Sequence, residues 1–289
     1  MTPKPETKLQ LAVKFAKKLG AKVCRLHDYK LYAVCNHGVI LIHDIDEDID
    51  VALSVTDTFD VIKQLGHNYT IIEMPSMIRF KGEVAYYDCH RAETPYVHDS
   101  QPDQMSIGVE SKRFMAALSA VAAIPDRSGS PVTTRVNIGP HHLSATNRRV
   151  YLEADHGLNN PPVGSIHGEA VQALFKIKEP LKAMGGSRES ITFRYPQFCL
   201  KFSLEPLVVY PCEFLDIECD QELTFESAMP LALISNLAKV VRFLGKEYYA
   251  DAMRHFAKHV LTFGVGEDKL VFRGKGVRGA VSKFYPEEE

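Results

Sequence analysis

The chain has 289 residues, 45% of them hydrophobic and 24% charged, a globular composition that excludes collagen-like, disordered and membrane-spanning proteins. Its formal net charge of −2 gives no bulk positive field, so binding to nucleic acid requires basic residues gathered on one surface. The first residues, MTPKPETK, lack the apolar core of a signal peptide, and we expect a cytoplasmic protein without a membrane partner.

The sequence predicts one recurring unit that consists of a strand, a helix and two or three further strands. The first helix is predicted at 7–19, and its leading strand is missing or very short. The second is predicted at 57–65 after an alternating strand at 51–55, with Thr56 as N-cap and Gly66 as the stop.

Three further helices follow the same pattern. One is predicted at 111–124, with Ser111 as its cap. The next is predicted at 179–184, where Pro180 suits a first helical position. The last is predicted at 230–244 and has its apolar residues on one face.

The strands after the helices also repeat. Residues 69–89 resemble 190–212, and residues 30–42 resemble 142–154. Residues 259–286 predict three more strands.

These repeats predict an α+β fold in which helices lie on one face of antiparallel sheets. Two full domains are expected at 1–103 and 104–220, and a partial domain is expected at 221–289.

The sequence offers no enzyme site and no cofactor or metal site. The pair His141–His142 lacks zinc spacing, the cysteines form no Cys-x-x-Cys pair, and no glycine cluster has the spacing of a phosphate-binding loop. We expect a protein without catalytic residues and with reduced, structural thiols. An enzyme or inhibitor that uses His141, His142 or Cys35 is the alternative, although no constellation supports it.

Charge is unevenly distributed between the predicted helices and the rest of the chain. The five predicted helices sum to +7, so the remainder carries −9. A basic helical surface on an acidic protein is typical of a protein that accepts DNA on one side only, through phosphate contacts that carry no sequence information.

The segment VESKRFMAALSAVAAIPDRSGSPVTTRVNIGPHHLSATNRRVYLEA (Val109 to Ala154) resembles the DNA polymerase sliding clamps, particularly the bacterial beta subunit of DNA polymerase III. In that family such a helix leads to a strand pair that carries a Thr-Asp-Gly-His-Arg-Leu-like motif. Here the motif is degraded to TNRRVY, which begins at Thr146. The likeness continues over residues 175–218.

The resemblance implies a ring of domains whose helices line a hole that holds double-stranded DNA. It also implies an apolar pocket beside the motif strand, where a DNA polymerase or a clamp loader docks a peptide. The implied pocket residues are Thr146, Arg149, Val150 and Tyr151. The implied DNA-facing residues are Lys14, Lys17, Lys18, Lys112, Arg113, Lys182, Lys239 and Arg242.

The number of subunits stays open, because the sequence indicates five units where a bacterial-type clamp has six. A homo-oligomer is expected, as a dimer, a trimer or an open form, and a diverged clamp without tryptophan suits a bacteriophage origin in an infected bacterial cell. The alternatives are a clamp-fold accessory factor that binds DNA without closing a ring, and a mimic that captures clamp partners.

Overall fold

The structure is a computed structural model that describes residues 6–66, 68–93, 105–107, 111–148, 150–175, 177, 179–210, 261–265, 269–274 and 277–282. Contacts divide the chain into two compact units, which are described separately. Unit 1 contains Met1–Ser106, Glu179–Gly185 and Ser190–Ser203. Unit 2 contains Ile107–Lys178, Gly186–Glu189 and Leu204–Glu289. The division into domains at 103 and 220 stays a prediction.

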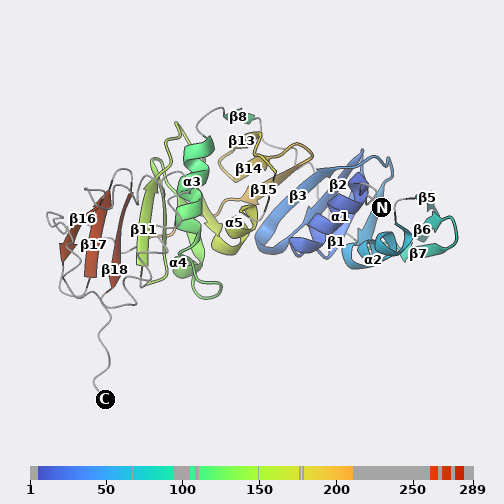
Figure 1. The fold of residues 1–289 in the computed structure, drawn as a ribbon, viewed down its shortest axis with the longest axis horizontal. Coiled ribbons are helices and arrows are strands. Elements are labelled where there is room, and N and C mark those ends of the chain that lie inside the picture. Colours follow the sequence, from blue (N-terminus) through green and yellow to red (C-terminus); the bar gives the residue numbers. More distant parts are fainter. Residues whose placement is uncertain are drawn as a thin grey trace, which may run out of the picture. The chain divides into compact units, whose positions relative to one another are not determined.

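Unit 1 is built on an eight-stranded sheet in the order β4-β1-β2-β3-β15-β14-β13-β8. Its strands are β1 (Val23–His27), β2 (Lys30–Val34), β3 (Val39–Asp44), β4 (Val51–Ser54), β8 (Met105–Ile107), β13 (Ala183–Gly186), β14 (Ser190–Arg194) and β15 (Phe198–Ser203). Alternate residues such as Leu26, Leu31 and Leu41 are fully buried on one face. Helices α1 (Lys8–Lys18) and α2 (Val55–Leu65) contact this sheet and each other (Figure 1).

The two helices of unit 1 begin where short polar side chains cap them. Thr7 and Gln10 form a capping box, in which the Thr7 hydroxyl accepts from the Gln10 N–H (3.2 Å), and this confirms the first predicted helix. Helix α2 begins earlier than predicted, because Ser54 accepts from the Asp57 N–H (3.3 Å). The prediction of Thr56 as N-cap is therefore wrong, since that residue lies inside the first turn.

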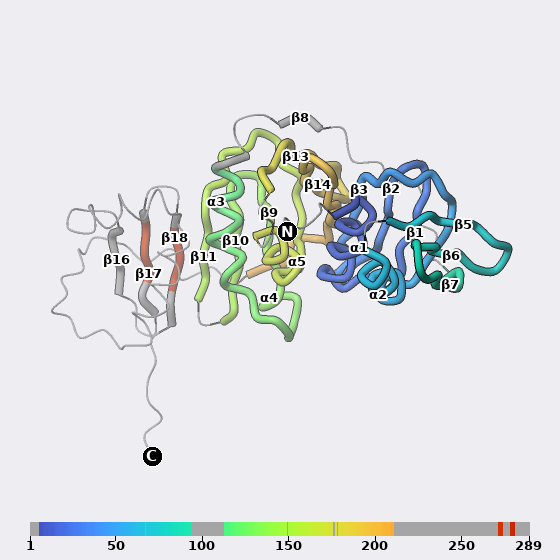
Figure 2. The backbone as a smooth tube through the Cα atoms, turned by 45° about the vertical axis from the view of Figure 1, so that its right-hand side comes forward, coloured from blue at the N-terminus to red at the C-terminus, as the bar shows by residue number. Residues whose placement is uncertain are grey.

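A second, three-stranded sheet completes unit 1, and it confirms the strands predicted at 69–89. Its strands are β5 (Tyr69–Glu73), β6 (Met77–Gly82) and β7 (Tyr86–His90). Ile78 and Phe80 of β6 are fully buried. Helix α2 contacts β4 of the first sheet and β6 and β7 of the second, so it ties both sheets into one core (Figure 2).

Unit 2 is built on a seven-stranded sheet in the order β12-β9-β10-β11-β18-β17-β16. Its strands are β9 (Arg135–Ile138), β10 (His142–Thr146), β11 (Val150–Asp155), β12 (Gly164–His167), β16 (Leu261–Val265), β17 (Lys269–Gly274) and β18 (Val277–Ser282). Strands β16 to β18 confirm the C-terminal strand prediction. Helix α3 (Ser111–Ala122) packs on β10 and β11 through fully buried Phe114 and Leu118, which confirms the third predicted helix.

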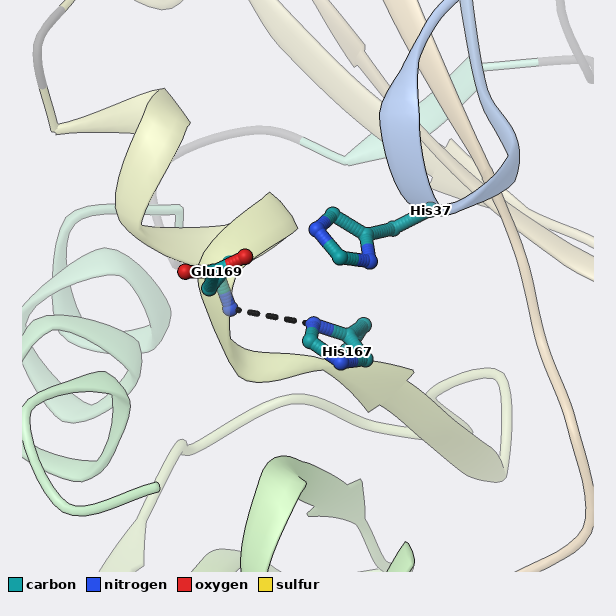
Figure 3. Close-up of side chains that lie close together, drawn as sticks. All are labelled: His37, His167 and Glu169. Atoms are coloured by element: carbon teal, nitrogen blue, oxygen red, sulfur yellow. Dashed lines mark hydrogen bonds between the residues drawn. The ribbon is translucent and has the colours of Figure 1, made fainter. Parts of the chain in front are cut away.

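Two short helices complete the described part of unit 2, α4 (Pro131–Thr134) and α5 (Gly168–Leu174). Helix α5 begins at an unusual cap, because Nδ1 of His167 accepts from the Glu169 N–H at 3.3 Å (Figure 3). None of the described helices is long and apolar enough to cross a membrane.

The helix predicted at 179–184 is wrong. Residues 179–182 are not helical, and Ala183–Gly186 forms β13. Pro180 and the Gly185–Gly186 pair leave too few residues between them for a stable helix. The N–H of Lys182 donates instead to the Arg194 carbonyl (2.8 Å), as in a sheet. The helix predicted at 230–244 lies outside the described residues.

The same topology occurs twice. The order β4-β1-β2-β3 in unit 1 matches β12-β9-β10-β11 in unit 2, which confirms the likeness of 30–42 to 142–154. The chain after β7 meets β4 at the Leu53–Arg91 bridge, and the chain after β15 meets β12 at the Ser165–Glu205 bridge.

Strand β7 therefore corresponds to β15. The likeness of 69–89 to 190–212 is out of step by one strand, because β15 is the last strand of its three-stranded set and residues 204–210 follow it.

The corresponding sheets join at two similar seams. At the first seam, β15 pairs antiparallel with β3, with Leu200 opposite Leu41. At the second seam, β18 pairs antiparallel with β11, with Gly279 opposite Leu152. In both cases the last strand of a three-stranded set pairs with the edge strand of a four-stranded set, β4-β1-β2-β3 at the first seam and β12-β9-β10-β11 at the second.

Candidate functional site

The predicted basic residues of α1 lie on its exposed side. The Lys14 ammonium lies 2.8 Å from a Glu6 carboxylate oxygen. The Lys17 ammonium lies 3.3 Å from Asp60 of α2 and 4.2 Å from the centre of the Phe59 ring. Lys18 is exposed at the end of the helix. With Lys8, α1 carries a charge of +4, so the basic character predicted for the first helix is present.

The other predicted basic residues are placed less uniformly. Arg113 is exposed on α3, 3.7 Å from Asp155 at the end of β11. Lys182 is exposed but precedes β13, so the prediction that it lies on a helix is wrong. The side chain of Lys112 and all of Lys239 and Arg242 lie outside the described residues.

The motif residues form the turn between β10 and β11. The Thr146 hydroxyl donates to the Val150 carbonyl (2.9 Å) and accepts from the Arg148 N–H (3.2 Å). The Asn147 side-chain oxygen accepts from the Val150 N–H (2.9 Å). Thr146 and Val150 are buried, so they hold the turn in place, while Arg149 lies outside the described residues.

Tyr151 starts an apolar cluster next to this turn. Its ring meets Tyr210 edge-on, with centroids 5.8 Å apart, and Val132 and Val208 pack against the pair. These residues come from α4, β11 and the segment after β15. The cluster lies beside the motif strand, and of its members only Tyr151 is among the pocket residues that the resemblance implies; the pocket itself stays a prediction.

Residues 204–210, which we call the strap, are fixed to the sheet of unit 2 by side-chain hydrogen bonds. The buried Asn137 amide donates to the Val208 carbonyl (2.6 Å) and accepts from the Val208 N–H (3.0 Å). The Tyr210 hydroxyl donates to the Arg135 carbonyl (3.1 Å), and Ser165 donates to Pro206 (2.8 Å). These bonds hold Tyr210 against Tyr151.

A buried carboxylate forms an ion pair between the two strands that meet at the second seam. Glu153 of β11 has a side chain only 5% exposed, and Arg278 of β18 contacts it through Nε (2.5 Å) and Nη2 (3.2 Å). His142 Nε2 also contacts the carboxylate, and the Tyr151 hydroxyl donates to it at 3.4 Å. At the first seam the corresponding pair is Ile42 opposite Cys199, which is apolar.

The remaining titratable candidates have structural surroundings. Burial raises the pKa of the Cys35 thiol to about 12, which disfavours the reactive thiolate. His142 contacts Glu153, and buried His156 uses both ring nitrogens, toward Gly139 and the Leu158 N–H. Nothing among the described residues arranges these groups around a substrate position.

No family model matches the sequence, and no curated protein matches it. Solved structures match over nearly the whole chain. The DNA polymerase III subunit beta from Pseudomonas aeruginosa gives a TM-score of 0.67 at 9% identity, covering 96% of this chain and 98% of that chain. The DNA polymerase sliding clamp from Bacillus subtilis gives 0.66 at 10% identity, with 97% and 98% covered. The chain has the sliding-clamp fold.

A third clamp structure shows a peptide complex. The Helicobacter pylori beta clamp bound to a DNA ligase peptide gives a TM-score of 0.64 at 7% identity, and 97% of this chain and 99% of that chain are covered. The fold resemblance expected from residues 109–218 is therefore confirmed, and it extends beyond them.

Sequence reasoning missed Tyr210, Val208 and Asn137. Asn137 and Val208 are separated by 71 positions, so no local spacing could pair them. The one available signal was the apolar run LVVY, which ends at Tyr210. The sequence predicted a strand there.

Proposed function

We propose that this protein is a DNA sliding clamp, a ring that encircles duplex DNA and tethers a DNA polymerase. The observation that carries the proposal is the clamp fold over 96% of the chain. A clamp acts by topology, so the proposal requires no catalytic residues and no cofactor. Weak phosphate contacts suffice, because a closed ring leaves DNA only by opening or by sliding off an end.

The repeated seams support ring closure between protomers. Strands β15 and β18 each pair with the edge strand of a four-stranded set, and β7 is the corresponding last strand of the three-stranded set β5-β6-β7. Among the described residues β7 pairs only with β6, so its outer edge is available to a second copy. Because the chain covers 98% of the P. aeruginosa subunit, we propose a head-to-tail dimer rather than a trimer.

The helical faces would supply the DNA contacts. Lys14, Lys17 and Lys18 of α1 and Arg113 of α3 are the described candidates. We expect them to contact phosphates, and the binding would therefore weaken steeply with salt.

The cluster of Tyr151, Tyr210, Val132 and Val208 would receive the partner peptide. Support comes from its place beside the β10–β11 turn and from the ligase peptide bound to the H. pylori clamp. A peptide with a large apolar side chain suits a cluster of two rings and two valines. In this proposal the polymerase, and a clamp loader if one is used, dock here.

Two measurements test the proposal together. Light scattering should give about twice the 32.4 kDa chain mass, stable on dilution. Protein loaded on nicked circular DNA should survive a salt wash and should be lost when the circle is linearised. A monomer held equally by linear and circular DNA would refute the ring and favour a non-ring accessory factor. A protein that binds polymerase but no DNA would favour a mimic.

A further inference from the structure

Three of the basic side chains proposed to face DNA form ion pairs with carboxylates. In each pair the carboxylate lies outside the helix that carries the cation. Lys14 pairs with Glu6 before α1 (2.8 Å), and Lys17 pairs with Asp60 of α2 (3.3 Å). Arg113 pairs with Asp155 at the end of β11 (3.7 Å). We call Glu6, Asp60 and Asp155 the counterion carboxylates.

The counterion carboxylates are placed so that they can compete with DNA phosphates. Their side chains are between 42% and 55% exposed, so solvent screens the pairs and each contributes little to folding. Lys17 is held from two sides, because its ammonium also lies over the Phe59 ring. A phosphate that takes Lys17 must displace Asp60 and remains close to its negative charge.

Lys18 provides the contrast. Within the part of the chain that the structure describes, no carboxylate oxygen is recorded within salt-bridge distance of its ammonium. The described cations proposed to contact DNA therefore differ: Lys14, Lys17 and Arg113 each have a carboxylate beside them, and Lys18 at the end of α1 does not.

We propose that Glu6, Asp60 and Asp155 are built-in counterions that keep the protein's contact with DNA weak. The inference rests on the proposed function and adds how the strength of that contact is set. By competing with phosphates for the same cations, the carboxylates reduce the number of cations that exchange their partners for DNA. The retained complex then slides, because no phosphate is held strongly.

The test compares two triple variants that change the net charge equally. The first removes the counterion carboxylates by Glu6→Gln, Asp60→Asn and Asp155→Asn. The control removes carboxylates from three other ion pairs by Glu73→Gln, Asp88→Asn and Asp50→Asn. Their partners, Arg91, Arg79 and Arg25, lie outside the helices, and the three carboxylate side chains are 29% to 56% exposed. Each variant loses one glutamate and two aspartates.

Affinity is measured on a short linear duplex across a series of salt concentrations. Each freed cation should tighten binding roughly two- to fivefold, the scale of one exposed ion pair, so we expect about tenfold or more for the counterion variant. The slope of log K against log salt should steepen by about 0.9 for each additional phosphate contact. The control should tighten binding about twofold at most, with an unchanged slope.

A second comparison assigns the gain to the cations. Adding Lys14→Gln, Lys17→Gln and Arg113→Gln to the counterion variant should abolish both the gain and the change in slope. Equal effects of the two triple variants would show a bulk charge effect and overturn the inference. An unchanged affinity in the counterion variant would overturn it as well.

Failure of the inference is distinguishable from failure of the proposed function. Wild-type retention on circular DNA, measured in parallel, decides whether the protein is a ring. If the wild type is retained and the counterion variant binds no tighter, only the inference fails. Native mass and circular dichroism of every variant establish that the fold and the oligomer are intact.

Discussion

The most informative single perturbation is Arg278→Met, which removes the partner of a buried carboxylate at the second seam. The change deletes two charge-assisted bonds to Glu153, at 2.5 and 3.2 Å, and replaces them with an apolar side chain of similar length. Breaking a buried ion pair costs about 3–5 kcal/mol. We reduce this to about 2 kcal/mol, because Arg278 is 46% exposed and His142 and Tyr151 still contact the carboxylate.

The assay is hydrogen exchange of the β18 amides, which reports opening of the seam rather than global unfolding. A loss of about 2 kcal/mol accelerates exchange roughly 30-fold. Arg188→Met is the matched control, because Arg188 is exposed in the loop before β14, a strand of the eight-stranded sheet, whereas this seam joins two strands of the seven-stranded sheet. It should change exchange less than about twofold.

A second substitution keeps the reasoning falsifiable. Glu153→Gln in the Arg278→Met background should recover at least half of the loss, because a neutral amide costs less to bury than an unpaired carboxylate. Unchanged β18 exchange in Arg278→Met, an equal effect of Arg188→Met, or no recovery by Glu153→Gln would each refute the argument.

Three further predictions concern the strap, the second seam and acid stability. Asn137→Ala should lower the free energy of unfolding by about 1–3 kcal/mol, because it removes both side-chain bonds to Val208 of the strap. The released strap should bind a polymerase peptide more weakly while the oligomer mass stays constant, and an unchanged peptide affinity would contradict this prediction. Gly279→Ala should weaken the pairing of β18, because a Cβ there would lie 2.5 Å from the Phe272 ring and closer still to the Tyr151 carbonyl; wild-type β18 exchange would contradict it. Burial lowers the pKa of His43 and His156 from the ordinary 6.5, so below about pH 6.5 the unfolded chain binds more protons than the folded chain. The free energy of unfolding measured with urea should therefore fall as the pH drops below about 6.5, and the fall should be smaller in His43→Gln.

Elements that depend on nearby residues were predictable from the sequence. The first helix was predictable from its spacing, and its start is also decided locally, because Thr7 accepts from the N–H of Gln10 three positions away. The strands at 69–89 were predictable for the same reason, since alternation and tight turns are local. The end of α2 at Gly66 was also correct, because a φ of 74° there favours glycine.

The errors arose where distant partners decide the local structure. Residues 179–184 contain a proline that suits a first helical position, yet the Lys182 N–H donates to the carbonyl of Arg194 in β14. The strap was predicted to be a strand from its sequence. In the structure the side chain of Asn137, instead of a neighbouring strand, makes the hydrogen bonds to its backbone. For the candidate site, the resemblance implied the motif turn and Tyr151, while the contact of Tyr210 with Tyr151 could be found only from the fold.

The first seam constrains how this chain folds as it is synthesised. Strand β3 ends at Asp44, but the strand that covers its edge, Phe198–Ser203, leaves the ribosome more than 150 residues later. At about 5–20 residues per second, that edge stays open for roughly 8 to 30 s. Because an unpaired edge is a template for aggregation, we expect the nascent N-terminal half to depend on chaperones until residue 203 emerges.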